Sequence, residues 1–168
     1  VPLVLHEANA IPGKALEFLS HVASGVAVNF EDARKRLRHE RMAVTGFPVR
    51  EGLTREQAPG STSGAGGFTV LVMGGSQGAH RLNDLVPRAI ASARILGEDI
   101  RAIHLAGVKD AAEVKQAYQD AGTPHEVHEF LQDMGSAYAR AGLVVARAGA
   151  GTCADILECA VPSLLVPL

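Results

Sequence analysis

The amino-acid sequence predicts an α/β fold with a doubly wound parallel sheet, and two observations carry that prediction. Short apolar runs alternate with amphipathic stretches along all 168 residues, and two glycine-lined turns, at 74–78 and 148–152, directly follow apolar runs. Repeated strand–helix units of this length require parallel pairing with right-handed crossovers. Ligands of such sheets bind beyond the carboxyl ends of the strands, so we expect both turns at the ligand edge.

The first part of the chain has the pattern of a β-α-β-α-β unit. Strands are predicted at 3–5, 26–29 and 42–44, and helices at 13–23 and 31–37, before a turn at Gly46-Phe47-Pro48. The following stretch GSTSGAGG at 60–67 has no hydrophobic period, and its Gly/Ser composition is typical of a loop or linker.

The second part repeats the alternation more regularly. The run FTVLVM at 68–73 is continuously apolar, as expected of a strand whose sheet is covered by helices on both faces. Further strands are predicted at 100–107, 125–130, 143–147 and 163–168, and helices at 79–93, 110–122, 133–142 and 153–160. Asp110 and Glu113 have the spacing of a capping box, Gly122 stands where a helix ends, and Asp133 is a candidate N-cap. Pro87 predicts a kink in its helix.

Composition excludes several classes of protein. Sixteen basic against eighteen acidic residues give a net charge of −2, and aromatic residues are only 4%, so nucleic acid is not an expected partner. Cys153 and Cys159 have no neighbouring His/Cys cluster, and no Asp-x-Asp ends a strand, so we expect neither a metal site nor a disulfide framework. Two cysteines without such a framework favour a protein of the reducing cytoplasm, and because no apolar run reaches 18 residues we expect no membrane-spanning helix.

The two glycine turns are candidate anion sites. Glycine lets the backbone approach a ligand closely, and the free N–H groups of a helix's first turn carry partial positive charge. GGSQGA is not the dinucleotide fingerprint G-x-G-x-x-G, and neither turn has the G-K-[ST] ending of a P-loop. A tight turn without a ligand remains the alternative for each of them.

Five blocks of sequence, in order along the chain, carry a family resemblance. They are LHEANAIPG (5–13), GFPVR (46–50), VMGGSQGAHRLN (72–83), HEFLQDMGSAY (128–138) and ARAGAGT (146–152), the last followed by PSLLVPL. Together they resemble the MurG family, bacterial enzymes that transfer N-acetylglucosamine from a UDP donor to the lipid-linked muramyl-pentapeptide of peptidoglycan synthesis. The resemblance implies a GT-B fold, in which two Rossmann-like domains face each other across a cleft.

The resemblance also implies a domain assignment. Residues 1–48 correspond to the end of the N-terminal, acceptor-side domain, and residues 49–168 to most of the C-terminal, donor-side domain. Because the chain opens and closes on apolar strand-like runs without an initiating Met, we expect an internal fragment of a longer protein.

Candidate ligands of the donor follow from the same blocks, each by its place in the family motif. The resemblance implies that the diphosphate is bound by Ser76, Gln77, Gly78 and Arg50, and the uracil by the backbone of Leu131, with Met134 close by. It implies that Gly149, Ala150, Gly151 and Thr152 lie near the sugar and phosphates, and that Asn9 contacts the sugar. The resemblance implies no cofactor, and it places the general base outside this chain, so the catalytic residue is unknown.

Some positions depart from the family pattern. Asp155 stands where the family has the Glu that binds the ribose hydroxyls, and its spacing from Thr152 also fits a capping box, which is the alternative role. Phe47 replaces an Asn in the turn before Arg50. Arg147 at a strand end has two interpretations, a phosphate contact or a solvated side chain, and the solvated one is favoured. His6 is expected to orient its neighbours, and His104, His125 and His128 to be ordinary strand residues.

The function implied by the resemblance is conversion of undecaprenyl-pyrophosphoryl-MurNAc-pentapeptide to its GlcNAc-bearing product, with inversion, at the cytoplasmic face of the plasma membrane. The basic run 33–41 is either a solvated helix face or a contact with anionic lipid. Two other functions remain open: a different UDP-sugar glycosyltransferase or epimerase of the same fold, and a non-catalytic UDP-sugar-binding subunit.

Overall fold

A computed structural model of the chain describes residues 1–49, 53, 67–74 and 79–167. It divides into two compact units, Val1–Val49 and Arg50–Leu168. Both are α/β units with entirely parallel sheets, so the predicted fold class is confirmed.

The first unit is a three-stranded sheet with two short helices. Its elements are β1 (Val4–Glu7), α1 (Lys14–Ser20), β2 (Gly25–Val28), α2 (Glu31–Arg36) and β3 (Met42–Val44). The strands pair in the order β1-β2-β3. A small core of Val26, Val28, Ala33 and Leu37 joins β2 to α2.

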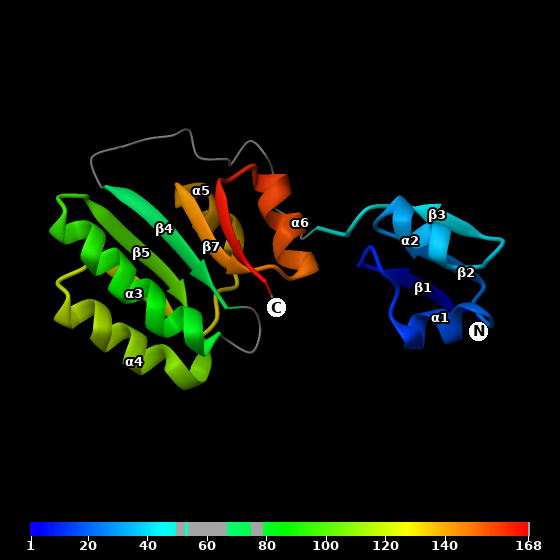
Figure 1. Cartoon of the computed structure of the whole chain (residues 1–168), viewed down its shortest axis with the longest axis horizontal. Helices are drawn as coiled ribbons and strands as arrows, with labels where there is room; N and C mark the ends of the chain where they lie inside the picture. Colours follow the sequence, from blue (N-terminus) through cyan, green and yellow to red (C-terminus); the bar gives the residue numbers. More distant parts are fainter. Residues whose placement is uncertain (50–52, 54–66, 75–78, 168) are drawn as a thin grey trace. The chain divides into compact units, whose positions relative to one another are not determined.

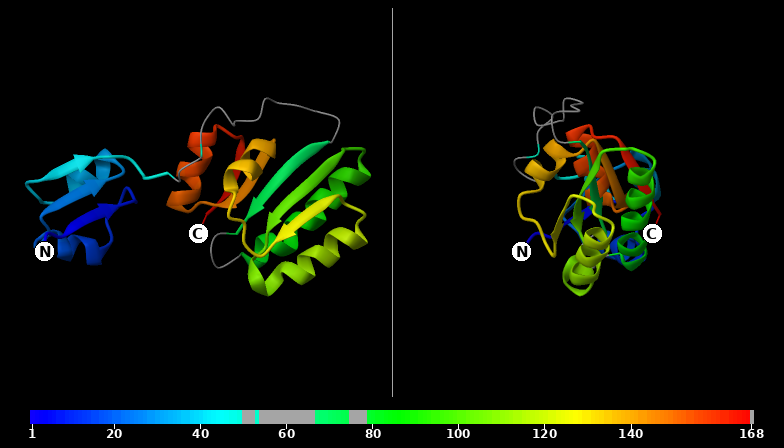
Figure 2. Two further views of the ribbon diagram at one scale, coloured as in Figure 1. Left: turned by 180° about the vertical axis from the view of Figure 1, so that it is seen from behind. Right: turned by 90° about the vertical axis from the view of Figure 1, so that its left-hand side faces the viewer.

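The second unit is a five-stranded sheet between two layers of helices. Its elements are β4 (Phe68–Met73), α3 (His80–Ile95), β5 (Ile100–Leu105), α4 (Gly107–Asp120), β6 (His125–His128), α5 (Met134–Arg140), β7 (Leu143–Arg147), α6 (Ala150–Cys159) and β8 (Ser163–Val166). Helices α3 and α4 cover one face, and α5 and α6 cover the other (Figure 1). The view from behind in Figure 2 shows the same layers.

The alternation of side chains along the strands explains the two layers. On β4, Val70 and Val72 pack against the α3/α4 layer, while Leu71 and Met73 pack against the α5/α6 layer. Successive side chains of a strand point to opposite faces, so a strand buried on both faces must be apolar throughout. The continuous run FTVLVM therefore specifies a central strand.

Helix boundaries agree with the predictions except where capping boxes were invoked. Asp133 caps α5 as predicted, accepting a hydrogen bond from the Ser136 N–H at 3.0 Å. Gly122 follows the end of α4 with φ +60°, a conformation that glycine adopts without strain. The capping box at Asp110 is wrong, because α4 already begins at Gly107 and Asp110 lies within its first turn. Helix α3 continues through Pro87, which is buried.

Candidate functional site

The ligand edge of the second unit follows from its strand order, β6-β5-β4-β7-β8. After β4 the chain moves outward to β5 and β6, and then returns to place β7 on the other side of β4. The strand order therefore reverses between β4 and β7, and ligands of open α/β sheets bind outside the carboxyl ends of the strands at such a point. Both glycine turns begin here, one after Met73 of β4 and one after Arg147 of β7.

The first turn is described at its two ends only. Gly74 is buried at the end of β4, and Ala79 is the N-cap of α3. Three of the proposed diphosphate ligands, Ser76, Gln77 and Gly78, lie outside the described residues, as does Arg50.

The second turn presents the N-terminus of α6 to this edge. Gly149 is the N-cap, in an extended conformation, and no side chain caps the helix. The first N–H groups of a helix have no intrahelical acceptor, so those of Ala150, Gly151 and Thr152 are available to a ligand. Together with the helix dipole they form a site suited to an anion.

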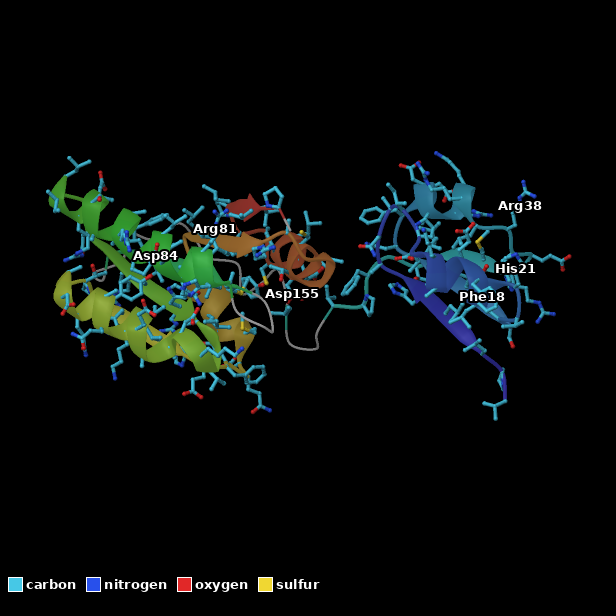
Figure 3. All side chains as sticks on the ribbon, turned by 60° about the horizontal axis from the view of Figure 1, so that its bottom comes forward. Phe18, His21, Arg38, Arg81, Asp84 and Asp155 are labelled. Carbon is cyan, nitrogen blue, oxygen red and sulfur yellow. The ribbon has the colours of Figure 1, made fainter. Side chains whose placement is uncertain are left out.

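This helix start also decides between two roles for Asp155. A capping box would place Thr152 at the N-cap, but Thr152 is the third residue of α6. The capping role for Asp155 is therefore wrong. Asp155 lies in the middle of α6 and is only 2% exposed; Figure 3 labels it.

Arg147 departs in part from its sequence-based expectation of a solvated guanidinium. The residue is partly exposed, but its Nε is buried and has no hydrogen-bond partner in the part of the chain that the structure describes. Leaving a buried donor unpaired costs roughly 1–3 kcal/mol. An Arg at the end of β7, beside the second glycine turn, is thus a candidate anion ligand that sequence reasoning set aside.

The segment after β6 carries the proposed uracil contact. Leu131 is partly buried against the core of the α5/α6 face, and its backbone N–H makes no hydrogen bond to the residues described. Met134 is 4% exposed and is the first residue of α5. Its side chain belongs to the core of the α5/α6 face, and its backbone N–H donates to the Gln132 carbonyl at 3.1 Å.

In the first unit, Glu7 organises the turn that holds Asn9. The buried Glu7 carboxylate accepts hydrogen bonds from the Asn9 backbone N–H (2.9 Å), from Asn9 Nδ2 (3.0 Å) and from the Gly13 N–H (3.0 Å). Burial raises the pKa of Glu7, but these hydrogen bonds outweigh it and lower the pKa below its ordinary value. The carboxylate is therefore charged at neutral pH and fixes the orientation of the exposed Asn9 amide.

His6 makes a local contact of the kind expected for an orienting residue. Its Nε2 donates to the carbonyl oxygen of Gly46 at 3.0 Å, and its ring meets Phe47 edge-on at a centroid distance of 5.9 Å. The end of β1 is thereby tied to the turn in which Phe47 replaces the family's Asn.

Among residues 1–49, 53, 67–74 and 79–167, no three His, Cys, Asp or Glu side chains gather as they would around a metal ion. In the same residues, no helix has the length and apolar character needed to cross a bilayer.

The strand order defines the class of protein: a doubly wound α/β domain, with the N-terminus of α6 at its switch point as a candidate anion site. Residues 69–168 match the glycosyltransferase family 28 C-terminal domain, and the chain belongs to this family.

Similar proteins extend the likeness over the whole chain. Enzymes from Geobacter metallireducens and Alcanivorax borkumensis are 37% and 39% identical over 99% and 100% of this chain; both are named UDP-N-acetylglucosamine–N-acetylmuramyl-(pentapeptide) pyrophosphoryl-undecaprenol N-acetylglucosamine transferase. The crystal structure of Acinetobacter baumannii MurG is similar over 100% of the chain, at 29% identity and a TM-score of 0.74. The chain spans about half the length of these proteins, 46% in each case. The glycosyltransferase of kitacinnamycin, 19% identical with a TM-score of 0.52, shares the fold.

Proposed function

We propose that the full-length protein transfers N-acetylglucosamine from UDP-GlcNAc to undecaprenyl-pyrophosphoryl-MurNAc-pentapeptide, with inversion, in peptidoglycan synthesis. The observation that carries the proposal is the similarity of the whole chain, first unit included, to transferases of that name. Residues 1–48 then belong to the acceptor-side domain and residues 49–168 to the donor-side domain.

The donor diphosphate is assigned to the switch point between β4 and β7. Ser76, Gln77 and Gly78 hold it from one side, and the N–H groups of Ala150, Gly151 and Thr152 from the other, with Gly149 as the N-cap that lets the diphosphate approach the helix. The guanidiniums of Arg50 and Arg147 supply positive charge. The support for Arg147 is the unpaired, buried Nε beside the second turn.

The rest of the donor is assigned to the neighbouring strand ends. The Leu131 N–H, which bonds to none of the described residues, suits a uracil carbonyl, with Met134 close by. Asp155, one methylene shorter than the family's Glu, is assigned to the ribose hydroxyls. Asn9, held by Glu7, is assigned to the sugar.

This arrangement favours departure of UDP. As the bond to the anomeric carbon breaks, negative charge grows on the β-phosphate. Backbone N–H groups and guanidiniums already aimed at that phosphate stabilise the transition state more than the ground state. The general base that takes the proton of the acceptor hydroxyl lies outside these residues.

The acceptor is lipid-linked, so we also propose a peripheral contact with the cytoplasmic face of the plasma membrane. In the basic run 33–41, two charges are already paired on α2: Arg34 with Glu31 at 3.5 Å and Lys35 with Asp32 at 2.8 Å. Arg38 and Arg41 are exposed, and Figure 3 marks Arg38. Anionic lipid attracts each such charge by about 1 kcal/mol, so the run supplies only part of the attraction.

Calorimetric titration of the full-length protein with UDP and UDP-GlcNAc tests the donor site. Binding of both is expected, and Arg50→Ala should weaken it by about 1.5–3 kcal/mol, the worth of charge-assisted phosphate bonds. Unchanged affinity in that variant would remove Arg50 from the site.

A transfer assay with the lipid-linked acceptor tests the reaction. UDP-glucose and dTDP-sugars serve as competing donors. Turnover with UDP-GlcNAc is expected; a preference for another donor, or binding without transfer, would replace the proposed function with one of the two alternatives.

A further inference from the structure

A chain of buried polar groups crosses the α3/α4 face of the five-stranded sheet. His104 of β5 is completely buried, with Nε2 3.0 Å from Asn83 Oδ1 and Nδ1 3.1 Å from the Tyr118 hydroxyl. Asn83, 4% exposed in the first turn of α3, donates from Nδ2 to the Ala106 carbonyl (2.9 Å) and to Asp110 Oδ2 (2.8 Å). Four elements of the fold contribute to this chain: β5, the β5–α4 junction, α3 and α4.

Only one arrangement of protons satisfies these contacts. The Ala106 carbonyl and the Asp110 carboxylate are acceptors, so both point to the NH2 end of the Asn83 amide, and Oδ1 must face His104. His104 therefore donates from Nε2 and accepts at Nδ1 from the Tyr118 O–H. Burial lowers the pKa of His104 to about 4, which keeps the ring in this neutral form. A fully satisfied polar network of this kind specifies one geometry of the elements it joins.

The network reaches the ligand edge around Asn83, at the first turns of α3 and α4. Asn83 joins the first turn of α3 to Ala106, the N-cap of α4, whose own N–H bonds to the His128 carbonyl at the end of β6. At this same end, α3 has no side-chain cap, so its first N–H groups face the edge where the diphosphate is assigned. Tyr118 lies far along α4 from that edge, near the C-terminal end of the helix.

We propose that Asn83 is a positioning residue for the donor diphosphate: its amide locks the first turn of α3 against the carboxyl end of β5 and so aims the α3 amides at the phosphates. This inference rests on the proposed UDP site. Asn83 itself touches no reacting atom; it acts through the helix start that follows the first glycine turn.

Three variants of the full-length protein test the assignment. Asn83→Ala removes the amide. Asp110→Ala removes one acceptor of that amide and is the second variant should Asn83→Ala fail to fold. Tyr118→Phe is the matched control, since it removes a hydrogen bond of the same buried network but leaves all the contacts of Asn83 in place.

UDP and uridine are titrated into each variant, and the free energy of unfolding is measured alongside. We expect the UDP dissociation constant to rise about ten-fold in Asn83→Ala and about three-fold in Asp110→Ala, with uridine affinity unchanged because uridine has no phosphate. Tyr118→Phe should lose stability and keep its UDP affinity. Without ligand, amide hydrogen exchange at residue 83, whose N–H bonds to the Ala79 carbonyl at 2.9 Å, should accelerate most in Asn83→Ala, less in Asp110→Ala and not in Tyr118→Phe.

Each outcome bears on a different claim. Unchanged UDP affinity in Asn83→Ala and Asp110→Ala, or equal losses for UDP and uridine, overturns the positioning role while the UDP site stands. An equal loss in Tyr118→Phe overturns it too, because general destabilisation then explains the effect. Failure of the unaltered protein to bind UDP rejects the proposed function, and the inference with it.

Discussion

The two faces of the five-stranded sheet are buried in different ways. The α5/α6 face is held by a mainly apolar cluster that includes Leu71, Ile103 and Val144, all almost fully buried. On the α3/α4 face, the apolar cluster surrounds the polar chain of Asn83, His104 and Tyr118. Apolar packing is non-directional, whereas hydrogen bonds fix distance and angle. The difference indicates that one face chiefly supplies stability and the other also fixes geometry.

The largest expected effect tests the apolar face. Leu71→Ala should lower the free energy of unfolding by about 2–5 kcal/mol, because it leaves a cavity at a completely buried site. Urea denaturation measures the loss. Leu85→Ala on α3, where the side chain is 58% exposed, is the control and should change stability by less than about 0.5 kcal/mol. If Leu71→Ala unfolds with the same free energy as the unaltered protein, the apolar α5/α6 face is not the main source of stability.

The next effect belongs to the polar face and depends on pH. The pKa of His104 is lowered by burial to about 4, against about 6.5 in an unfolded chain. Between pH 6.5 and 4, His104 binds a proton in the unfolded state but stays neutral in the folded state. The free energy of unfolding therefore falls as the pH drops from 6.5 to 4. The difference of about 2.5 units corresponds to roughly 3 kcal/mol.

Comparison with His104→Gln isolates this effect, because Gln can still donate to Asn83 and does not titrate. Denaturation at several pH values should show a shallower decline for the variant between pH 6.5 and 4. Parallel declines in the two proteins would assign the acid sensitivity to other groups.

A smaller effect concerns the start of α5. Asp133→Ala should cost about 1 kcal/mol, since it removes the side-chain acceptor of the Ser136 N–H. Asp133→Asn is the matched control and should retain most of the stability, because Asn caps a helix nearly as well. Thermal unfolding of the two variants measures the difference; equal losses would show that charge rather than capping stabilises this helix.

The smallest effect is expected at the surface, where Arg140 of α5 and Glu126 of β6 form a bidentate ion pair. Arg140 Nη1 and Nη2 donate to Glu126 Oε1 and Oε2 at 2.7 and 2.9 Å. Both side chains are 45% exposed, so solvent and salt screen the pair. Glu126→Gln should cost about 0.5 kcal/mol at low salt and less at high salt. A loss above about 2 kcal/mol would contradict this and would show that the ion pair is important for attaching α5 to the sheet.

Sequence reasoning succeeded where the relevant physics is local. FTVLVM specified the central strand β4 because its apolar side chains alternate between two buried faces. Asp133 was recognised as an N-cap because capping depends on a side chain and an N–H three residues away. The same rule misled at Asp110 and at Thr152, where glycine-containing junctions started each helix earlier than the spacing suggested.

Sequence reasoning did not predict contacts between residues that are far apart in the chain. His104 has the sequence pattern of an ordinary strand residue. Its hydrogen-bond partners, Asn83 and Tyr118, lie 21 positions earlier and 14 positions later, so the neighbouring residues do not indicate them. Arg147 was expected to be solvated, because the burial of its Nε depends on what packs around the end of β7.

The sequence by itself determined the order of strands and helices, the parallel pairing and the two glycine turns. These follow from hydrophobic period, crossover length and backbone freedom, which are properties of neighbouring residues. Only the tertiary structure decided that β4 and β7 are neighbours and that Asn83 joins α3 to the end of β5. Those facts depend on how segments far apart in the chain pack, and packing is set by the whole fold.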